Sequence, residues 1–222
     1  MDFFDLHTHC LDTHPSIIAI HNVYPEILSG NQELPTPFSC GIHPWFITPD
    51  LLPLRYSQSE VLLANPACIA VGEAGLDKNS SISMQLQLDV FRQMIAYSEK
   101  YRKPLIVHCV KAYDQLVALH KQLCPVQPWI LHGFRGKPEL ARQLTAQGFY
   151  LSFGQQFNEQ TLRSVEPSCF FLETDDSNFN ISTLYQQVAF LRNIPLHQLV
   201  ADINLRARQL FGSDLFQNLL EK

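Results

Sequence analysis

Eight short apolar runs recur along the chain, and they constrain its fold more than any other feature. Most are nearly continuous in apolar residues rather than alternating with polar ones, which is typical of strands buried on both faces of a parallel sheet. Residues that favour turns bound each run. The runs occupy residues 2–9, 16–21, 37–44, 68–76, 104–109, 128–134, 149–154 and 170–175.

Helical patterns separate the later runs. Residues 84–101 place apolar side chains at helical spacing and follow serines that can cap a helix. A second pattern, residues 138–147, starts at a proline and is followed by Gly148, and a third, residues 194–211, precedes Gly212. Eight strands alternating with helices predict the α/β class and a (β/α)8 TIM barrel.

The first connections of this barrel are short. Only 31 residues separate His9 from Gly41, so the early helices are expected to be short or irregular. The whole chain has 222 residues, and 46% of them are hydrophobic. That is enough for one sizeable core, so we expect a single domain over residues 1–222.

Charge and cysteine content narrow the function classes. No basic region followed by an apolar stretch marks a secretion signal, and no apolar run approaches membrane-spanning length, so we expect no membrane association. Six cysteines without CxxC pairing favour reduced thiols and a cytoplasmic location. A net charge of -5 argues against broad electrostatic attraction to nucleic acid, so a phosphate-bearing substrate requires a local cationic centre. No obligate protein partner is indicated.

Ionisable residues follow the predicted strands at their carboxyl ends, where a barrel carries its chemistry. His7 and His9 lie two residues apart on an extended chain, so both imidazoles face the same side and can share one ion. One such residue alone is more often a hydrogen-bonded core residue. A set at buried strand ends is costly unless it is coordinated, and therefore predicts a metal site. The set is His7, His9, Glu73, His108, His132 and Asp175; His43 and Glu173 also end predicted strands, whereas His14, His21, His120 and His197 are interpreted as surface or structural residues.

Short motifs follow one another in the order and spacing of a known family, over nearly the whole chain. They are DLHTHCLD (5–12), GIHPW (41–45), VGEAGLD (71–77), PLIVHC (104–109), LHGFRG (131–136), GFYLSFG (148–154), LETD (172–175) and NLRARQLFG (204–212). The sequence thus resembles the TatD-type metal-dependent deoxyribonucleases, a branch of the amidohydrolase-like barrel superfamily. The resemblance implies a (β/α)8 hydrolase of shortened length, with DNA as its substrate and two divalent ions as cofactors.

The resemblance also implies the roles of the site residues. Glu73 is expected to bridge the two ions, and Asp175 to ligate or orient the attacking water and to take its proton. These two are the predicted catalytic residues. Imidazole and carboxylate ligands accept Mg, Mn, Zn or Ni, so the metal stays open. The implied ligands are His7 and His9 for one ion, His108 and His132 for the other, with Glu73 and Asp175.

Three departures from the family pattern fall in regions that face the substrate. Val110 stands where an arginine is usual, with Lys111 beside it, residues 176–180 read DSNFN, and the segment between the first and third runs is short. We therefore expect the metal chemistry to transfer better than the DNA specificity. Aromatic residues at positions 45, 46 and 134 are candidates for stacking on a base. Candidates for phosphate contacts are Lys78, Lys111 and Arg135.

Three alternatives to a nuclease stay open. One is an amidohydrolase acting on a small cyclic amide or ester, although many such barrels carry a carbamylated lysine where this chain has Glu73. Another is a PHP-like phosphoesterase, which would need a late Asp-x-His pair; the only histidine after His132 is His197. A non-catalytic binding protein is the third, and the loss of a ligand would favour it, but none of the six is lost.

Overall fold

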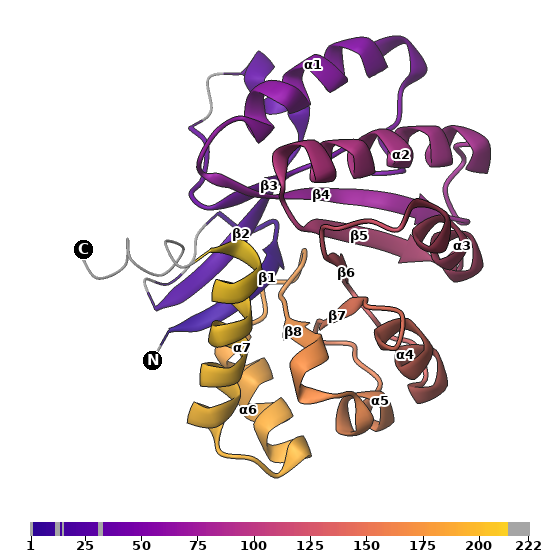
Figure 1. Ribbon diagram of the computed structural model, residues 1–222. Coiled ribbons are helices and arrows are strands. Elements are labelled where there is room, and N and C mark those ends of the chain that lie inside the picture. Colours follow the sequence, from indigo (N-terminus) through magenta and orange to yellow (C-terminus); the bar gives the residue numbers. More distant parts are fainter. Residues whose placement is uncertain (1, 12–13, 15, 31–32, 213–222) are drawn as a thin grey trace. The chain divides into compact units, whose positions relative to one another are not determined.

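The computed structural model describes residues 2–11, 14, 16–30 and 33–212. In this part of the chain, strands and helices follow one another in the order that the apolar runs predict (Figure 1). Each of the eight runs overlaps one strand, which confirms the predicted strand count. The strands are β1 (Phe3–Thr8), β2 (Ile17–Val23), β3 (Phe38–Cys40), β4 (Cys68–Asp77), β5 (Leu105–Val110), β6 (Trp129–Leu131), β7 (Tyr150–Phe153) and β8 (Phe170–Leu172).

Helix α2 (Met84–Tyr101) has the predicted bounds, and the Ser83 side chain caps it by accepting a hydrogen bond from the Leu86 N–H. The other two predicted helices are each shorter by two residues, because α4 ends at Thr145 and α7 begins after Pro195. Helix α4 spans Pro138–Thr145 and α7 spans Leu196–Phe211. The remaining helices lie in segments that carried no clear helical pattern. They are α1 (Leu52–Leu63), α3 (Tyr113–Leu123), α5 (Glu159–Ser164), α6 (Ile181–Arg192) and the 3-10 helices η1 (Pro25–Ser29), η2 (Pro49–Leu51) and η3 (Pro167–Cys169).

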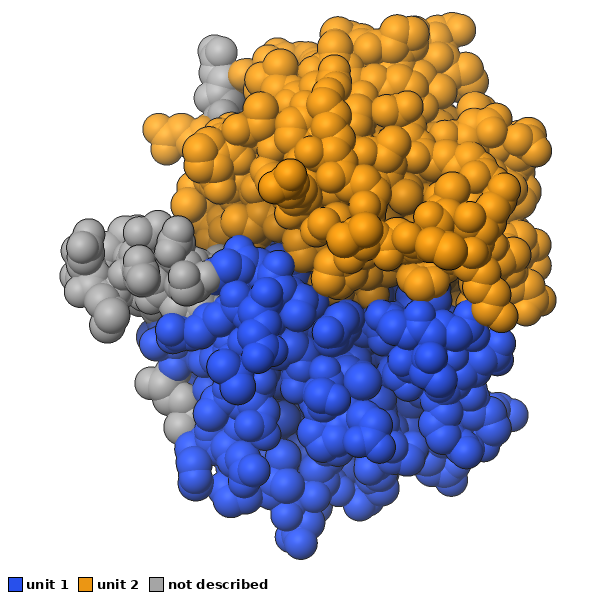
Figure 2. Space-filling view, in the orientation of Figure 1, with its two compact units in different colours: residues 1–21, 131–222 blue, residues 22–130 orange. Residues whose placement is uncertain are grey.

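The early connections are short, as predicted. Within the described residues, no helix lies between β1 and β2, and η1 is the helix between β2 and β3. The chain divides into two compact units, coloured separately in Figure 2: unit 1 is residues 1–21 and 131–222, and unit 2 is residues 22–130. The single domain over residues 1–222 remains a prediction.

Unit 1 is built on parallel strands covered by the C-terminal helices. β1 pairs with β2, β7 pairs with β8, and an isolated parallel bridge joins Thr8 to Asp175. Helices α6 and α7 pack against β1. The Tyr185 hydroxyl of α6 donates a hydrogen bond of 2.8 Å to the Phe4 carbonyl, and the Phe4 ring packs on Phe171. This core holds the carboxyl ends of β1 and β8 beside each other.

Unit 2 is built on β4, which pairs in parallel with β3 on one side and β5 on the other. Helix α2 covers β4. From this helix, Phe91 packs edge-to-face on Trp129, with ring centroids 5.4 Å apart and both side chains buried. Burial of such side chains stabilises a fold by about 1.5–3 kcal/mol each. In the described part of the chain, no helix is long and apolar enough to cross a membrane.

Candidate metal-binding clusters

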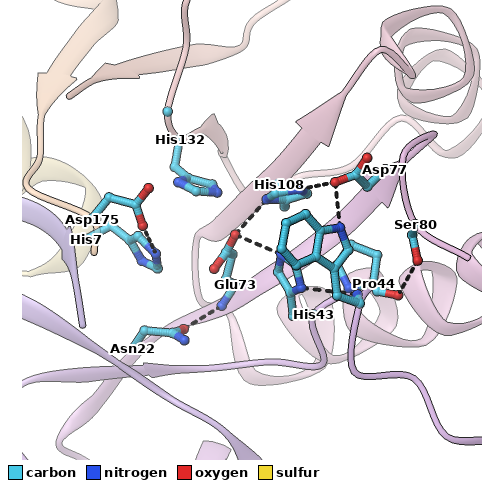
Figure 3. A network of polar contacts seen from close by, with 12 residues as sticks. His7, Asn22, His43, Pro44, Glu73, Asp77, Ser80, His108, His132 and Asp175 are labelled. Carbon is cyan, nitrogen blue, oxygen red and sulfur yellow. Dashed lines mark hydrogen bonds and ion pairs between the residues drawn. The ribbon is translucent and has the colours of Figure 1, made fainter. Parts of the chain in front are cut away.

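Unit 1 brings four predicted site residues together at the ends of its strands. His7 and His9 both face Asp175, with distances of 3.8 and 3.6 Å from their Nε2 atoms to Asp175 Oδ1 (Figure 3 draws the His7 pair). The His132 ring lies beside the His7 ring, with centroids 4.7 Å apart. Ligand atoms of His7, His132 and Asp175 all lie within 4.8 Å of one another. The prediction that His7 and His9 face one side is confirmed.

Backbone hydrogen bonds fix Asp175 against this pair of histidines. Its N–H donates to the His7 carbonyl, and its carbonyl accepts from the His9 N–H, both at 2.9 Å. These bonds form the bridge between Thr8 and Asp175. Asp175 has a φ of 56°, in the left-handed region that aspartate tolerates better than most residues. The carboxylate is therefore positioned by the main chain rather than by chance contact of side chains.

The buried carboxyl group of Asp5 holds the segment that carries Asp175. Asp5 accepts hydrogen bonds from the Thr174 N–H at 3.0 Å and from the Thr174 hydroxyl at 2.7 Å. Burial raises the pKa of Asp5 to about 7, although the Thr174 hydrogen bonds oppose the rise. Thr174 precedes Asp175, so these contacts hold the residue next to the ligand in place.

Glu173 orients His132. This carboxylate is fully buried, accepts a hydrogen bond of 2.6 Å from the Gly133 N–H, and lies 3.4 Å from His132 Nδ1. Burial by itself raises the pKa of Glu173, but the hydrogen bond and the charge of His132 outweigh it, so the pKa lies below its ordinary value. An ionised partner at Nδ1 favours the tautomer protonated there, which leaves the Nε2 lone pair for a metal ion.

Unit 2 assembles a second cluster around Glu73, in the middle of β4. Glu73 Oε1 lies 2.7 Å from His108 Nδ1 and 3.3 Å from His43 Nε2 (Figure 3), and ligand atoms of these three residues all lie within 4.8 Å of one another. The Glu73 N–H donates to Asn22 Oδ1. His43 Nδ1 accepts from the Trp45 N–H at 3.1 Å. The His43 proton therefore belongs on Nε2, which makes His43 a hydrogen-bond donor rather than a ligand.

Asp77 holds the far side of His108. Its Oδ2 lies 3.1 Å from His108 Nε2 (Figure 3). Oδ2 also accepts a 2.7 Å hydrogen bond from Trp45 Nε1, while Oδ1 accepts from the Asn79 N–H. The Gln87 amide bonds both the N–H and the carbonyl of Asp77. Burial raises the pKa of the Asp77 carboxyl, but the hydrogen bonds it accepts outweigh this and lower the pKa below its ordinary value.

A glycine allows β4 to approach β5 at this cluster. Gly75 has a φ of 158°, and a Cβ built there would lie 1.9 Å from the His108 carbonyl oxygen. Any other residue would push the strands apart. Gly75 lies midway between Glu73 and Asp77, so the close approach brings both carboxylates to the His108 ring.

The prediction that Phe134 stacks on a base is wrong. Phe134 is 1% exposed and packs edge-to-face on Phe153, so its ring is not accessible to a base. Burial of an apolar ring in the core is more favourable in free energy than its exposure to solvent, so a phenylalanine that follows a buried strand packs inward. Trp45 and Phe46 are 56% and 48% exposed, respectively, which leaves stacking by these two as a prediction.

The predicted phosphate contacts are on the surface. Lys78, Lys111 and Arg135 are all exposed. Lys111 Nζ donates to Asn79 Oδ1, and Arg135 Nη1 donates to Gln156 Oε1 at 2.7 Å. Exposed cations are available to a substrate, so these contacts stay predictions.

The six predicted ligands divide between the units. Unit 1 gathers four of them and unit 2 the other two, so the predicted pairing of His108 with His132 and the bridging role of Glu73 remain predictions. Three partners were left out of the predicted set although the structure places each within 3.4 Å of a histidine or carboxylate of a cluster. They are His43, Asp77 and Glu173.

The comparison with protein families decides the family. The model of the TatD related DNase family matches residues 27–212. The chain belongs to this family. It is therefore a TatD-like metal-dependent hydrolase, as its motifs predict. An uncharacterized metal-dependent hydrolase of Buchnera aphidicola is 27% identical over 212 residues, covering 88% of this chain and 76% of the relative. The 3'-5' ssDNA/RNA exonuclease TatD of Erwinia amylovora is 29% identical over 180 residues, covering 68% and 69%.

Solved structures confirm the predicted (β/α)8 fold. A TatD homologue from Escherichia coli has a TM-score of 0.75 at 17% identity, covering 94% of this chain and 97% of its own. A TatD family hydrolase from Entamoeba histolytica has a TM-score of 0.76 at 15% identity, covering 95% and 98%. A dihydroorotase also shares the fold, with a TM-score of 0.65 at 14% identity and coverage of 95% and 71%. The fold alone therefore does not separate a nuclease from an amidohydrolase.

Proposed function

We propose that this TatD-like hydrolase cleaves phosphodiester bonds of DNA with two divalent metal ions. The observation that carries the proposal is the gathering of imidazoles and a carboxylate in unit 1, at the ends of strands from opposite ends of the sequence. The names of relatives such as the Erwinia amylovora exonuclease support a nucleic acid as the substrate. The proposed ligands are His7, His9, Glu73, His108, His132 and Asp175.

The unit 1 cluster fits a divalent ion. Ligands bind such an ion at about 2.0–2.2 Å, so two ligand atoms of one ion lie at most ~4.4 Å apart. The ligand atoms of His7, His132 and Asp175 lie within 4.8 Å of one another, which small side-chain rotations bring into range. The contact of Glu173 with His132 Nδ1 directs Nε2 toward this ion.

The unit 2 cluster offers two ligands to a divalent ion, Glu73 and His108, because His43 acts as a donor. His108 has a carboxylate at each ring nitrogen, Glu73 at Nδ1 and Asp77 at Nε2. A neutral imidazole carries one proton and can donate to one of them. With that proton on Nε2, the Nδ1 lone pair and Glu73 are presented to the same ion. Asp77 then acts as the hydrogen-bonded partner that most metal-ligating histidines have.

Bound divalent ions would supply a Lewis acid for the phosphate and would lower the pKa of a bound water toward neutrality. Asp175 contributes the base, because its carboxylate is 30% exposed and can accept the proton of the attacking water. His43 contributes a donor to Glu73, because its proton lies on Nε2, 3.3 Å from Glu73 Oε1, and this contact orients the carboxylate. Exposed Trp45 and Phe46 offer stacking surfaces for an unpaired base.

The test uses chelated protein reloaded with Mn, Mg, Zn or Ni. Each form is incubated with labelled single-stranded and double-stranded DNA, RNA, a generic phosphodiester and a cyclic amide. We expect chelation to abolish DNA cleavage and at least one metal to restore it. Cleavage of the cyclic amide alone would contradict the nuclease and support the amidohydrolase alternative.

A variant of Asp175 tests its catalytic role. Asparagine keeps the shape and one ligand oxygen but removes the charge and most of the basicity. Loss of a positioned base typically lowers a rate by about 10² to 10⁴, so we expect Asp175→Asn to reduce turnover at least 10²-fold with little change in melting temperature. The exposed Asp50→Asn is the matched control. Near-normal turnover with normal metal content would remove Asp175 from the mechanism.

A further inference from the structure

A small cavity in unit 1 opens beside Asp175. Loops that follow β6, β7 and β8 line it, and its volume is about 70 Å³. A water molecule needs ~15 Å³ of such volume, so the cavity holds about five non-hydrogen atoms. That is the size of one phosphate group, so the cavity has room for a backbone phosphate.

The lining of the cavity contains one cation. All of its lining residues lie in the part of the chain that the structure describes. Among them Arg135 is the single basic residue, whereas Glu173, Asp175 and Asp176 are acidic. Arginine offers a planar fork of donors that matches two phosphate oxygens. Gln156 Oε1 accepts from Arg135 Nη1 at 2.7 Å, which orients the guanidinium within the lining.

The backbone of Arg135 is anchored on both sides, which distinguishes it from an ordinary surface arginine. Before it, Phe134 is buried, and its N–H donates to the Ser152 carbonyl at 2.8 Å. After it, a Cβ on Gly136 would lie 2.5 Å from the Phe134 ring, so the chain packs tightly here. The Gly136 carbonyl accepts a 2.7 Å hydrogen bond from the buried Thr161 hydroxyl. The side chain is exposed, but it starts from a rigid base.

We propose that Arg135, oriented by Gln156, binds the substrate phosphate next to the scissile one. This inference rests on the proposed function. The cavity lies beside Asp175, so a nucleic acid strand that presents one phosphate to the metal ligands presents its neighbour to Arg135. The subsite contributes binding rather than chemistry.

The experiment compares Arg135→Gln and Arg135→Lys with the wild-type enzyme on single-stranded DNA. We expect Arg135→Gln to raise KM about tenfold with kcat changed less than threefold, and Arg135→Lys to recover part of the loss because it keeps the charge without the fork. The slope of log binding constant against log salt should become shallower by about 0.7, the value for one phosphate contact to a single strand. Arg142→Gln, another exposed arginine of unit 1, is the matched control.

A neutral linkage locates the contact. A methylphosphonate at the neighbouring position should raise KM for the wild-type enzyme and leave Arg135→Gln nearly unaffected. An unchanged KM and salt slope for Arg135→Gln would overturn the subsite while DNA cleavage by the wild type still supports the proposed function. If the wild-type enzyme cleaves neither DNA nor a small phosphodiester, the proposed function is overturned, and the subsite with it.

Discussion

Replacing Asp77 with asparagine tests how His108 is held for its ion. In the structure, Asp77 Oδ2 faces two donors, Trp45 Nε1 at 2.7 Å and His108 Nε2 at 3.1 Å, and Oδ1 faces the Asn79 N–H at 2.7 Å. Both oxygens of the aspartate are therefore acceptors. Asparagine has one acceptor oxygen, so in either orientation its NH2 group points at a donor.

The magnitude follows from burial and charge. Asp77 is fully buried, so water does not replace the lost acceptor. A hydrogen bond to a charged group contributes about 1.5–3 kcal/mol, and one or two of them are lost. Loss of the partner that orients a metal-ligating histidine typically lowers metal affinity or activity by about 10- to 100-fold. We expect Asp77→Asn to reduce both within that range.

The assay measures metal affinity by competition with a chelator, DNA cleavage, and unfolding in urea on the same preparation. Trp45→Phe removes one donor and leaves the contact between Asp77 and His108, so it should weaken metal binding less. Asp50→Asn, at an exposed position, is the control. If Asp77→Asn lowers the unfolding free energy but leaves metal affinity and turnover at wild-type values, Asp77 is a structural residue alone and does not hold His108 for an ion.

Two further predictions concern stability and thiol chemistry. Tyr185→Phe removes the donor to the buried Phe4 carbonyl, so the unfolding free energy should fall by about 1–3 kcal/mol; a fall below ~0.5 kcal/mol in urea titration would contradict this. Burial raises the pKa of Cys68 to about 11 and that of Cys40 well above its ordinary value, whereas Cys124 is exposed. At pH 8 a thiol reagent should label Cys124 in the native protein and the two buried thiols only after denaturation, as peptide mass spectrometry would detect.

The strands were predictable because burial on both faces leaves a local signature. A strand covered on both sides is apolar throughout, so each run is visible without knowledge of its neighbours. The ends of a strand were less predictable where the chain stays buried beyond the last residue of the strand. β3 ends at Cys40, but residues 41–44 are also buried, so the apolar run extends beyond the hydrogen-bonded strand. An apolar run in the sequence indicates burial, whereas hydrogen bonding defines the strand. In this segment the two end at different residues.

Helix α1, which the sequence did not predict, has a buried face that includes polar side chains. In α1, Arg55 and Ser59 are buried with Leu62 and Leu63, so the apolar spacing of a helix is interrupted. Arg55 is compensated by the Phe46 carbonyl, to which it donates. Such a partner lies in another segment, and a pattern within the helix cannot report it. The buried face of α2 also includes the polar residues Gln87 and Ser98, but it carries no charge and its other buried residues are apolar or aromatic. Amphipathic spacing therefore predicts a helix with a mostly apolar buried face better than one with a compensated charge.

The ligands were more predictable than the residues that orient them. His7 and His9 are paired by their spacing on one strand, which is a local property. Asp77 reaches His108 only because Gly75 lets two strands approach, and that approach depends on a backbone conformation that the sequence does not state. The even spacing of Glu73 and Asp77 on β4 was the one available signal, since it places both on one face. Partners across strands are set by tertiary structure and stay outside such reasoning.

Each unit solves the same electrostatic problem in the same way. A buried carboxylate is costly unless donors stabilise its charge. Glu173 in unit 1 and Asp77 in unit 2 keep pKa values below the ordinary value despite burial, chiefly because an imidazole lies against each carboxylate, His132 in unit 1 and His108 in unit 2. The imidazoles of His132 and His108 are thereby oriented, because one nitrogen of each ring faces the carboxylate. The second nitrogen of each ring is fixed in direction before any ion binds, so metal affinity does not bear the full entropy of ordering these side chains.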